Sequence, residues 1–353
     1  MSKMILIVVG VILLVLIIGA GIYLWNSMNK PLYEPGLVRA EKNLRAPLVP
    51  PAQMEDSDFW QVEPDIQLHH FNAGEGRNVL IIHGGPGQPY LEAWPGLEAL
   101  AGDYRFHYYD QRGAGQSTRP IDTFDSKNFY ANSTRLEETL GLSAQLADIE
   151  RIRQILGEEK LIIIGHSFGA FQAALYAAEF PEHVEALVLV TPASMLLMPM
   201  EVPGLFETVE ELLPADMLAD YQTWQENYFD FGNIFSRSED ELVALNEEFA
   251  RYFVAALADE NIQIPENARP GGWMVHAMYL SMGQRHDYRP AMESVTAPVL
   301  IVHAADDFQA EAASRTYLDV FPHAQFETIA DAGHMVFYDQ PAQFAEVVSE
   351  FLP

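Results

Sequence analysis

The chain has 353 residues, of which 49% are hydrophobic, so it can build a large packed core and is too apolar for a disordered protein. Asp and Glu number 50 against 20 Lys and Arg, a formal net charge of -30 that repels phosphate backbones and excludes nucleic acid as a partner. The chain has no cysteine, which excludes a disulfide framework, a thiolate nucleophile and a Cys-ligated metal.

The N-terminal segment from Met4 to Trp25 is apolar and carries no charge. A helix of this length crosses a bilayer core, and Tyr23 and Trp25 stand where an interfacial aromatic belt lies. A cleaved signal peptide is the alternative, but its apolar region is shorter and is followed by a small-residue cleavage site. We therefore predict a single-pass anchor over residues 1–25 that contacts the lipid bilayer through residues 4–25.

Residues 26–60 contain five prolines and no sustained periodicity, and we predict a linker that lifts the following domain off the membrane. Four basic residues lie downstream of the anchor: Lys30, Arg39, Lys42 and Arg45. Only Lys3 and the α-amino group precede it. The positive-inside rule thus favours a cytoplasmic main domain by a small margin and leaves the side of the membrane open.

Beyond the linker, apolar β-branched runs alternate with helical patterns. The predicted strands are Val79–Ile82, Tyr104–Tyr109, Leu161–Ile164, Ala186–Val190 and Val299–Val302. The predicted helices include residues 134–156, which open with a Thr134-x-x-Glu137 capping-box pattern, and residues 168–180, 311–321 and 341–351. This alternation predicts an α/β fold, with a mostly parallel sheet and helices on both faces, over residues 61–194 and 290–353.

The alternation stops between residues 195 and 289, where the pattern is helical and rich in Glu and aromatic side chains. This region falls between two predicted strands. We therefore predict a helical cap inserted into the sheet domain, with most of its aromatic side chains in the core of the cap rather than in a pocket.

Gly165-His166-Ser167-Phe168-Gly169 directly follows a predicted strand and precedes a predicted helix. This is the context of the G-x-S-x-G nucleophile elbow, whose glycines avoid collisions with the neighbouring strand and helix. The pattern predicts Ser167 as the nucleophile and the Phe168 backbone N–H, at a helix N-terminus, as an oxyanion donor. Outside this context the pattern is only a structural turn, and we expect His166 to have a structural role.

A serine nucleophile needs a base and an orienting acid, which follow in the order acid and then His in this kind of fold. His334 lies in a loop after the predicted strand Gln325–Ile329 and is the expected base. The run Val-Leu-Ile-Val-His-Ala-Ala-Asp-Asp ends in Asp306 and Asp307, whose side chains diverge. We choose Asp307 as the acid and keep Asp306 as the alternative. Asp331 is too near His334 in sequence to orient it.

Two glycine-rich turns follow other predicted strands. In His83-Gly84-Gly85-Pro86-Gly87, the Gly85 N–H is the second expected oxyanion donor, with a plain Gly/Pro turn as the alternative and His83 as a brace. The turn at residues 110–117 suggests an internal Asp110–Arg112 pair. The sequence has no HExxH motif, Walker loop or dinucleotide fingerprint at a strand end, so we expect chemistry without a metal or cofactor.

These motifs resemble the α/β-hydrolase superfamily over roughly residues 60–353. More narrowly, HGGPG at 83–87 together with DQRGAGQS at 110–117 resembles the proline iminopeptidase branch of serine peptidases. The resemblance implies removal of an N-terminal residue, often proline, from peptides or amides. It also implies that carboxylates of the cap bind the free α-amino group, and the cap offers Glu207, Glu210, Glu211 and Glu226.

One departure from that branch bears on the substrate. The branch usually carries Gly-Gly-Ser-Trp-Gly at the elbow, whereas Gly-His-Ser-Phe-Gly is common among esterases, lipases and carbon–carbon bond hydrolases. A carboxylesterase or other small-molecule acyl hydrolase is therefore the main alternative, and a catalytically silent tethered binding module is a third. Ser167 argues against an epoxide hydrolase or dehalogenase, which would need a carboxylate at that position.

Overall fold

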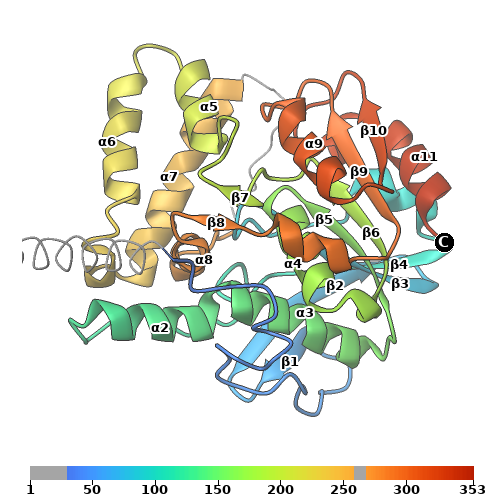
Figure 1. The fold of residues 1–353 in the computed structure, drawn as a ribbon, viewed down its shortest axis with the longest axis horizontal. Coiled ribbons are helices and arrows are strands. Elements are labelled where there is room, and N and C mark those ends of the chain that lie inside the picture. The colour runs from blue at the N-terminus through green and yellow to red at the C-terminus, as the bar shows by residue number, and fades with distance from the viewer. Residues whose placement is uncertain (1–29, 258–267) are drawn as a thin grey trace, which may run out of the picture.

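The computed structural model of the protein describes residues 30–257 and 268–353. Within them, one eight-stranded sheet has the order β1-β2-β4-β3-β5-β6-β9-β10 (Figure 1). The β1–β2 and β2–β4 pairs are antiparallel, and the other neighbouring pairs are parallel. The mostly parallel sheet predicted from the sequence is confirmed. Its strands are β1 (Phe59–Glu63), β2 (Ile66–Ala73), β3 (Arg77–Ile82), β4 (Tyr104–Tyr109), β5 (Leu161–His166), β6 (Val184–Val190), β9 (Val299–Ala304) and β10 (Gln325–Ile329).

Alternate residues of the central strands point into two separate apolar layers. In β3, Leu80 and Ile82 pack into the layer that contains residues of α3 and α4, whereas Val79 and Ile81 pack into the layer that contains residues of α11. Helices on both faces explain why these strands read as continuous apolar runs. The helices of this domain are α2 (Phe129–Leu140), α3 (Leu142–Leu156), α4 (Phe168–Glu179), α9 (Glu311–Val320), α10 (Val336–Asp339), α11 (Pro341–Phe351) and the 3-10 helices η1 (Pro95–Leu100), η2 (Pro181–His183) and η4 (Arg289–Ser294).

The single helix predicted over residues 134–156 is two helices, α2 and α3. Gly141 between them has a ψ of -178°, which is extended rather than helical, and a side chain there would overlap the carboxylate of Glu137. The capping box predicted at Thr134 does not form. Instead, Asn128 caps α2 by accepting a hydrogen bond from the Ala131 N–H at 3.1 Å.

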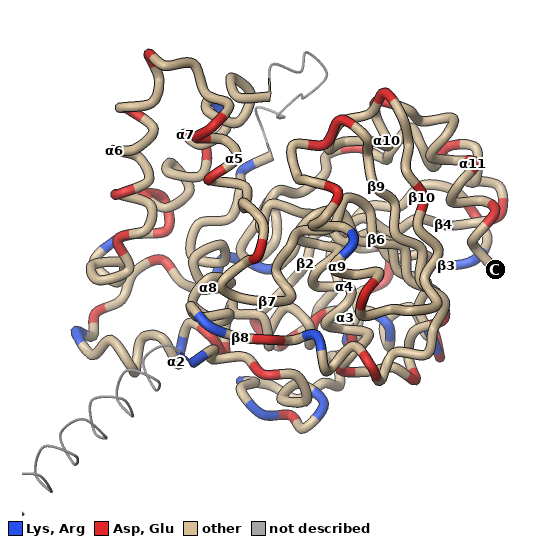
Figure 2. The backbone as a smooth tube through the Cα atoms, turned by 45° about the horizontal axis from the view of Figure 1, so that its top comes forward, with Lys and Arg blue, Asp and Glu red and all other residues tan. Residues whose placement is uncertain are grey.

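A helical cap lies beside the sheet domain, at the left of Figure 1, and the chain enters and leaves it through the antiparallel β7–β8 pair. Trp224 is 2% exposed at the centre of the cap, where its ring packs against Tyr228 and Phe249. Acidic positions are spread over the cap helices as well as the sheet domain (Figure 2). The elements of the cap are β7 (Leu197–Met198), α5 (Leu205–Leu212), α6 (Leu218–Tyr228), η3 (Ile234–Ser236), α7 (Glu239–Leu257), α8 (Trp273–Met282) and β8 (His286–Asp287).

Part of the segment predicted as a linker at residues 26–60 contacts the sheet domain at the end of α4. The buried carboxylate of Glu179, at the end of α4, accepts hydrogen bonds from the Tyr33 hydroxyl at 3.0 Å, the Gly36 N–H at 2.7 Å and the Arg39 N–H at 3.0 Å. Residues 33–39 are thus bound to the sheet domain, and the role of the segment as a linker to a membrane stays a prediction. Proline-rich sequence without periodicity excludes regular structure, but it says nothing about contacts with a distant helix.

The predicted anchor at residues 1–25 lies outside the described residues. Among the helices that the structure describes, none combines the length and apolar character needed to cross a membrane.

Candidate active site

Ser167 occupies a sharp turn between β5 and α4, with φ 53° and ψ -119°. A positive φ is uncommon for a residue with a side chain. The two flanking glycines explain how the turn fits. A Cβ on Gly165 would lie 2.7 Å from the Ala170 nitrogen, and one on Gly169 would lie 2.7 Å from the His83 carbonyl oxygen. The elbow therefore requires glycine at both positions, as the sequence pattern predicts.

The backbone of the elbow is tied to the end of β6. The Ser167 N–H donates to the Val190 carbonyl at 2.9 Å, and the Ser167 carbonyl accepts from the Ala193 N–H at 3.2 Å. These bonds hold the strained turn, and the half-buried Ser167 side chain is carried at the carboxyl end of the parallel strands. In open α/β sheets this is the edge at which ligands bind.

His334, in the loop between β10 and α10, pairs with Asp307, which follows β9. The His334 Nδ1 lies 3.0 Å from Asp307 Oδ1 and 3.2 Å from Oδ2. The Asp307 side chain is 1% exposed, whereas Asp306 is exposed to solvent. Of the two adjacent aspartates, the structure thus brings only Asp307 to the imidazole.

The loop that carries His334 lies directly against the elbow. The rings of His166 and His334 have centroids 4.7 Å apart, and the His166 Nε2 is 3.0 Å from the His334 carbonyl oxygen. The acid–histidine pair and the serine elbow therefore lie at the same edge of the sheet.

The turn after β3 lies against the Ser167 elbow. A Cβ on Gly84 would lie 2.9 Å from the Ser167 Cβ, and the next residue, Gly85, has a φ of 112° that favours glycine. Within residues 30–257 and 268–353, neither the Gly85 N–H nor the Phe168 N–H donates a hydrogen bond to another protein group. Both N–H groups are therefore without a protein acceptor in the described residues.

His83 braces that turn, as expected. Its Nε2 accepts from the Gln111 N–H at 3.1 Å, which leaves Nδ1–H to donate to the Gly84 carbonyl at 3.0 Å. Burial lowers the pKa of His83, so the ring stays neutral in this arrangement.

The Asp110–Arg112 pair suggested for the next glycine-rich turn does not form. Arg112 is fully buried and donates to Asp148 at 2.5 and 2.6 Å and to Glu63 at 2.7 Å, while Asp110 accepts from the Gln116 N–H at 2.8 Å. The partners of Arg112 come from α3 and β1, which sequence proximity could not reveal. This turn joins parts of the scaffold.

Two neighbours of the His334–Asp307 pair were not predicted from the sequence. The Gln309 N–H donates to Asp307 Oδ1 at 3.0 Å, an Asx-turn that the order Asp-x-Gln after a strand could have indicated. The Phe308 ring lies 4.5 Å from His334 and 5.5 Å from Phe253 of the cap helix α7. No local signal predicts this contact, because it depends on where the cap sits.

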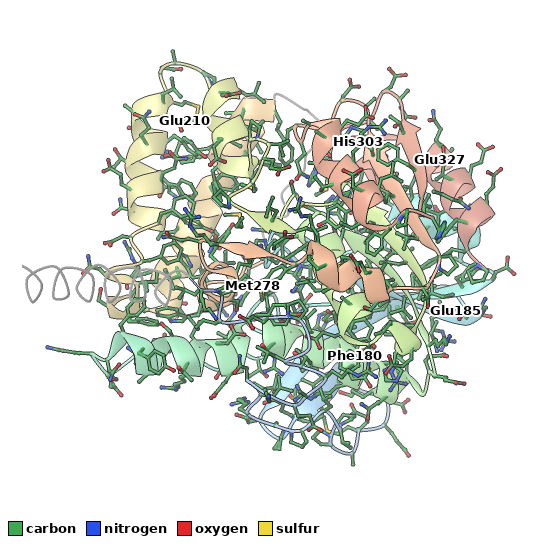
Figure 3. The ribbon with its side chains drawn as sticks, in the orientation of Figure 1. Phe180, Glu185, Glu210, Met278, His303 and Glu327 are labelled. Carbon is green, nitrogen blue, oxygen red and sulfur yellow. The ribbon has the colours of Figure 1, made fainter. Side chains whose placement is uncertain are left out.

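The four carboxylates predicted to be available in the cap lie on α5 and α6. Glu207, Glu211 and Glu226 are exposed, and Glu210 accepts from Gln222 at 2.8 Å between the two helices (Figure 3). In the part of the chain that the structure covers, none of the four hydrogen-bonds with the elbow or with His334. The same part contains no group of three or more His, Cys, Asp or Glu side chains arranged to hold a metal.

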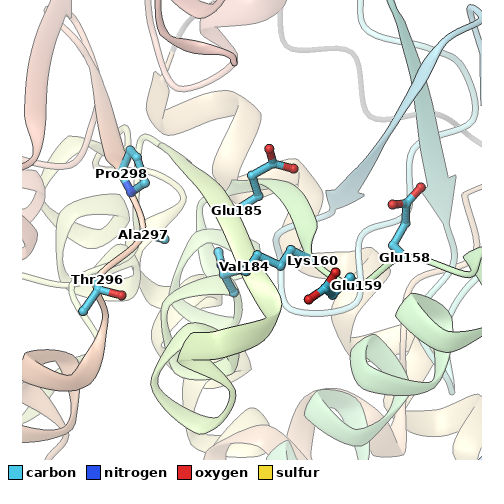
Figure 4. A pocket seen from close by; sticks show the side chains of 8 residues that line it. All are labelled: Glu158, Glu159, Lys160, Val184, Glu185, Thr296, Ala297 and Pro298. Carbon is cyan, nitrogen blue, oxygen red and sulfur yellow. The ribbon is translucent and has the colours of Figure 1, made fainter.

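A hollow of about 430 Å³ lies at the opposite edge of the sheet (Figure 4). Its lining includes Glu158 and Lys160 before β5, Val184 and Glu185 at the start of β6, and Pro298 before β9. These positions are at the amino ends of the strands, whereas Ser167 follows the carboxyl end of β5. This hollow is therefore not the place where a substrate would meet the serine.

A parallel sheet with a serine elbow, a histidine–aspartate pair and two free amides at one edge defines the class of α/β hydrolases. Residues 77–341 match the family model described as alpha/beta hydrolase fold, and the chain belongs to that family. Hydrolase is the activity class that this membership supports.

Two proline iminopeptidases are similar in sequence to most of this chain. A proline iminopeptidase from Heyndrickxia coagulans is 25% identical over 290 residues, which cover 79% of this chain and 91% of the relative. One from Saccharolobus solfataricus is 23% identical over 301 residues, 79% of this chain and 86% of the relative. The resemblance to the proline iminopeptidase branch is thus confirmed at low identity.

Solved structures share the fold. An esterase from Exiguobacterium antarcticum has a TM-score of 0.54 at 19% identity, covering 81% of this chain and 95% of that chain. A bromoperoxidase from Bacillus anthracis has a TM-score of 0.51 at 19% identity, with 81% and 95% coverage. At such identities the likeness shows the fold alone.

Proposed function

We propose that the protein is a serine hydrolase that removes an N-terminal residue, of the proline type, from peptides or amides through an acyl-enzyme. The observation that carries this proposal is the pairing of buried Asp307 with His334 on a loop packed against the Ser167 elbow. The named relatives support the peptide substrate. The formal net charge of -30 supports it as well, because an acidic surface attracts a cationic α-amino group.

In the proposed mechanism, the Ser167 hydroxyl attacks the scissile carbonyl while His334 Nε2 takes its proton. Asp307 holds the Nδ1–H tautomer and stabilises the imidazolium. The Gly85 and Phe168 amides receive the oxyanion, and loss of one such donor typically costs about 10²–10³ in rate. His334 then protonates the leaving amine, and a water molecule activated by the same imidazole hydrolyses the acyl-enzyme.

The test compares proline p-nitroanilide with p-nitrophenyl butyrate, using Ser167→Ala as the blank. We expect both substrates to be cleaved by the wild type and neither by the variant, and a fluorophosphonate to label the wild type alone. Failure of the fluorophosphonate to label the wild type would contradict a serine hydrolase and favour a silent binding module.

The second candidate function is that of a carboxylesterase or other small-molecule acyl hydrolase. The Gly-His-Ser-Phe-Gly elbow favours it, as does the absence, in the described ranges, of a hydrogen bond between the four cap carboxylates named above and the site. Cleavage of the ester without cleavage of the anilide would select this function over the peptidase.

We also propose, from the sequence alone, that residues 4–25 tether the enzyme to a bilayer, with the side of the membrane left open. The full chain should then stay in the membrane pellet after carbonate extraction, and a variant without residues 1–29 should not. Recovery of the full chain in the supernatant would contradict the tether.

A further inference from the structure

The His166 side chain connects two loops of the site. The Tyr90 Oη lies 2.6 Å from His166 Nδ1, and His166 Nε2 lies 3.0 Å from the His334 carbonyl oxygen. A carbonyl can only accept, so the hydrogen must be on Nε2. Nδ1 must then accept from the Tyr90 hydroxyl. The two partners together determine a single tautomer of the ring.

Both side chains keep their neutral forms in this chain of hydrogen bonds. His166 is 3% exposed, and burial lowers its pKa well below the ordinary value, with the neighbouring His334 acting in the same direction. Burial also raises the pKa of Tyr90, so its hydroxyl keeps its proton. With both ring nitrogens engaged, His166 is not available as a general base and acts as a fixed donor.

The chain of hydrogen bonds joins three separate parts of the site. Tyr90 follows the turn that carries the Gly85 amide, His166 immediately precedes Ser167, and the accepting carbonyl belongs to His334 itself. The Thr191 hydroxyl, at the end of β6, donates to the same carbonyl at 3.2 Å. The backbone of His334 is thus held by two donors, while Asp307 holds its ring.

Aromatic rings enclose this contact. The Phe337 ring lies 5.1 Å from His166 and 5.8 Å from Tyr90, and Trp94 stacks on Phe337 at 3.7 Å. In such an apolar enclosure an unsatisfied donor or carbonyl is costly, so loss of the His166 side chain cannot be compensated cheaply in place.

We propose that Tyr90 and His166 are positioning residues that set the His334 loop, and with it the imidazole, relative to Ser167. This inference rests on the proposed function and deepens it. It assigns a role to one of the two residues at which the elbow departs from the Gly-Gly-Ser-Trp-Gly pattern, because a glycine at position 166 could not make either hydrogen bond. Displacement of a catalytic group by about 1 Å can cost about 10²-fold in rate.

The test measures kcat and KM for p-nitrophenyl butyrate, together with thermal unfolding, in four variants. We expect His166→Leu, which keeps the volume and loses both hydrogen bonds, to lower kcat by about 10- to 100-fold with KM within about 2-fold. His166→Gln can offer an acceptor to Tyr90 and a donor to the carbonyl, and should recover most of that loss. Tyr90→Phe should lower kcat by about 3- to 10-fold, and should add nothing in the His166→Leu background because it acts through His166.

The matched control is Tyr104→Phe, which removes a hydroxyl that donates to the Pro353 carbonyl at 2.8 Å, away from the site. It should keep the wild-type kcat. Wild-type kcat in Tyr90→Phe and His166→Leu, or equal loss in His166→Leu and His166→Gln, would overturn the inference. Fluorophosphonate labelling of the wild type separates the two failures, since a labelled wild type leaves the proposed function standing and an unlabelled one removes both. If His166→Leu does not fold, Tyr90→Phe still decides.

Discussion

Ser167 holds a backbone conformation that costs about 1–3 kcal/mol and persists only where its surroundings impose it. Here the surroundings are the bonds to Val190 and Ala193 and the close approach of Gly165 and Gly169 to neighbouring backbone. The scaffold therefore supports the strain at the residue on which the proposed chemistry depends.

The first prediction at the residue scale concerns Gly165. Gly165→Ala should lower the free energy of unfolding by about 1–3 kcal/mol, because the added Cβ would meet backbone atoms that cannot rotate away. Urea unfolding measures the difference. Gly102→Ala is the control, since a Cβ there meets nothing within 4 Å. Equal stability of the two variants would contradict this account of the elbow.

A second prediction separates the two adjacent aspartates. Asp307→Asn should lower kcat by about 10⁴-fold, as loss of the orienting carboxylate does in serine triads, because it no longer holds His334 in the Nδ1–H tautomer. Asp306→Asn, at an exposed position, should stay within about 2-fold. Steady-state hydrolysis of p-nitrophenyl butyrate provides the comparison, and the reverse order would assign the acid to Asp306.

At the scale of elements, the antiparallel end of the sheet packs two imidazoles near Trp60, the half-buried His70 and the buried His107. The His70 ring stacks on Trp60 at 4.0 Å, and the His107 ring lies 5.9 Å from it. Burial lowers the pKa of each from 6.5 to about 4. As the pH falls, these two imidazoles therefore take up protons in the unfolded chain before they do so in the folded protein.

This gives a pH-dependent prediction. The native pKa values lie below the unfolded value, so the unfolded state binds more protons as the pH falls from about 6.5 to about 4, and stability is lost across that window. Between pH 7.5 and 5.0, His107→Gln should reduce the loss of unfolding free energy by about 2 kcal/mol relative to the wild type. Urea titrations at both pH values measure it.

His323→Gln, at an exposed position, is the control and should keep the wild-type pH dependence. An unchanged pH dependence in His107→Gln would show that this ring titrates alike in both states. Burial alone would raise the pKa values of the buried carboxylates Glu63 and Glu150, but pairing with Arg112 and Arg153 lowers them below 4.5. The contribution of these carboxylates to stability is therefore lost only at lower pH.

At the scale of the whole molecule, the N-terminal segment is held to the sheet domain at two places. The Glu179 carboxylate accepts hydrogen bonds from the Tyr33 hydroxyl and from the Gly36 and Arg39 N–H groups. The Arg151 guanidinium donates to the Ala46 and Pro47 carbonyls at 2.9 Å. The domain therefore continues into the segment that leads towards the predicted anchor.

We predict that Glu179→Ala releases this segment. Loss of three hydrogen bonds to one buried carboxylate should lower the free energy of unfolding by about 3 kcal/mol. Under native conditions, trypsin should then cut after Arg39 and Lys42, and mass spectrometry of the fragments identifies the sites. Glu185→Ala, which removes an exposed partner of Arg77, is the control and should resist trypsin like the wild type. A resistant Glu179→Ala would contradict this role of the carboxylate.

Much of the fold and site followed from short stretches of sequence. Strands β3, β5 and β9 were predictable because burial on both faces makes each a continuous apolar run, and the elbow because its glycines and flanking elements are neighbours in the chain. The split at Gly141 was missed, because the helical spacing of apolar residues runs on through a residue whose ψ leaves the helix.

The amino-acid sequence by itself determined the α/β class, the cap insertion as a prediction, and the residues Ser167, His334 and the Asp306–Asp307 pair as candidates. Only the tertiary structure decided that Asp307 faces His334, that Arg112 pairs with Asp148, and that His166 bonds to a carbonyl 168 residues further along the chain. The physical reason is the distance along the chain over which each kind of interaction acts. Apolar period, glycine fit and turn chemistry act between neighbours in sequence, whereas hydrogen-bond partners and burial depend on which distant segments the packed core brings together.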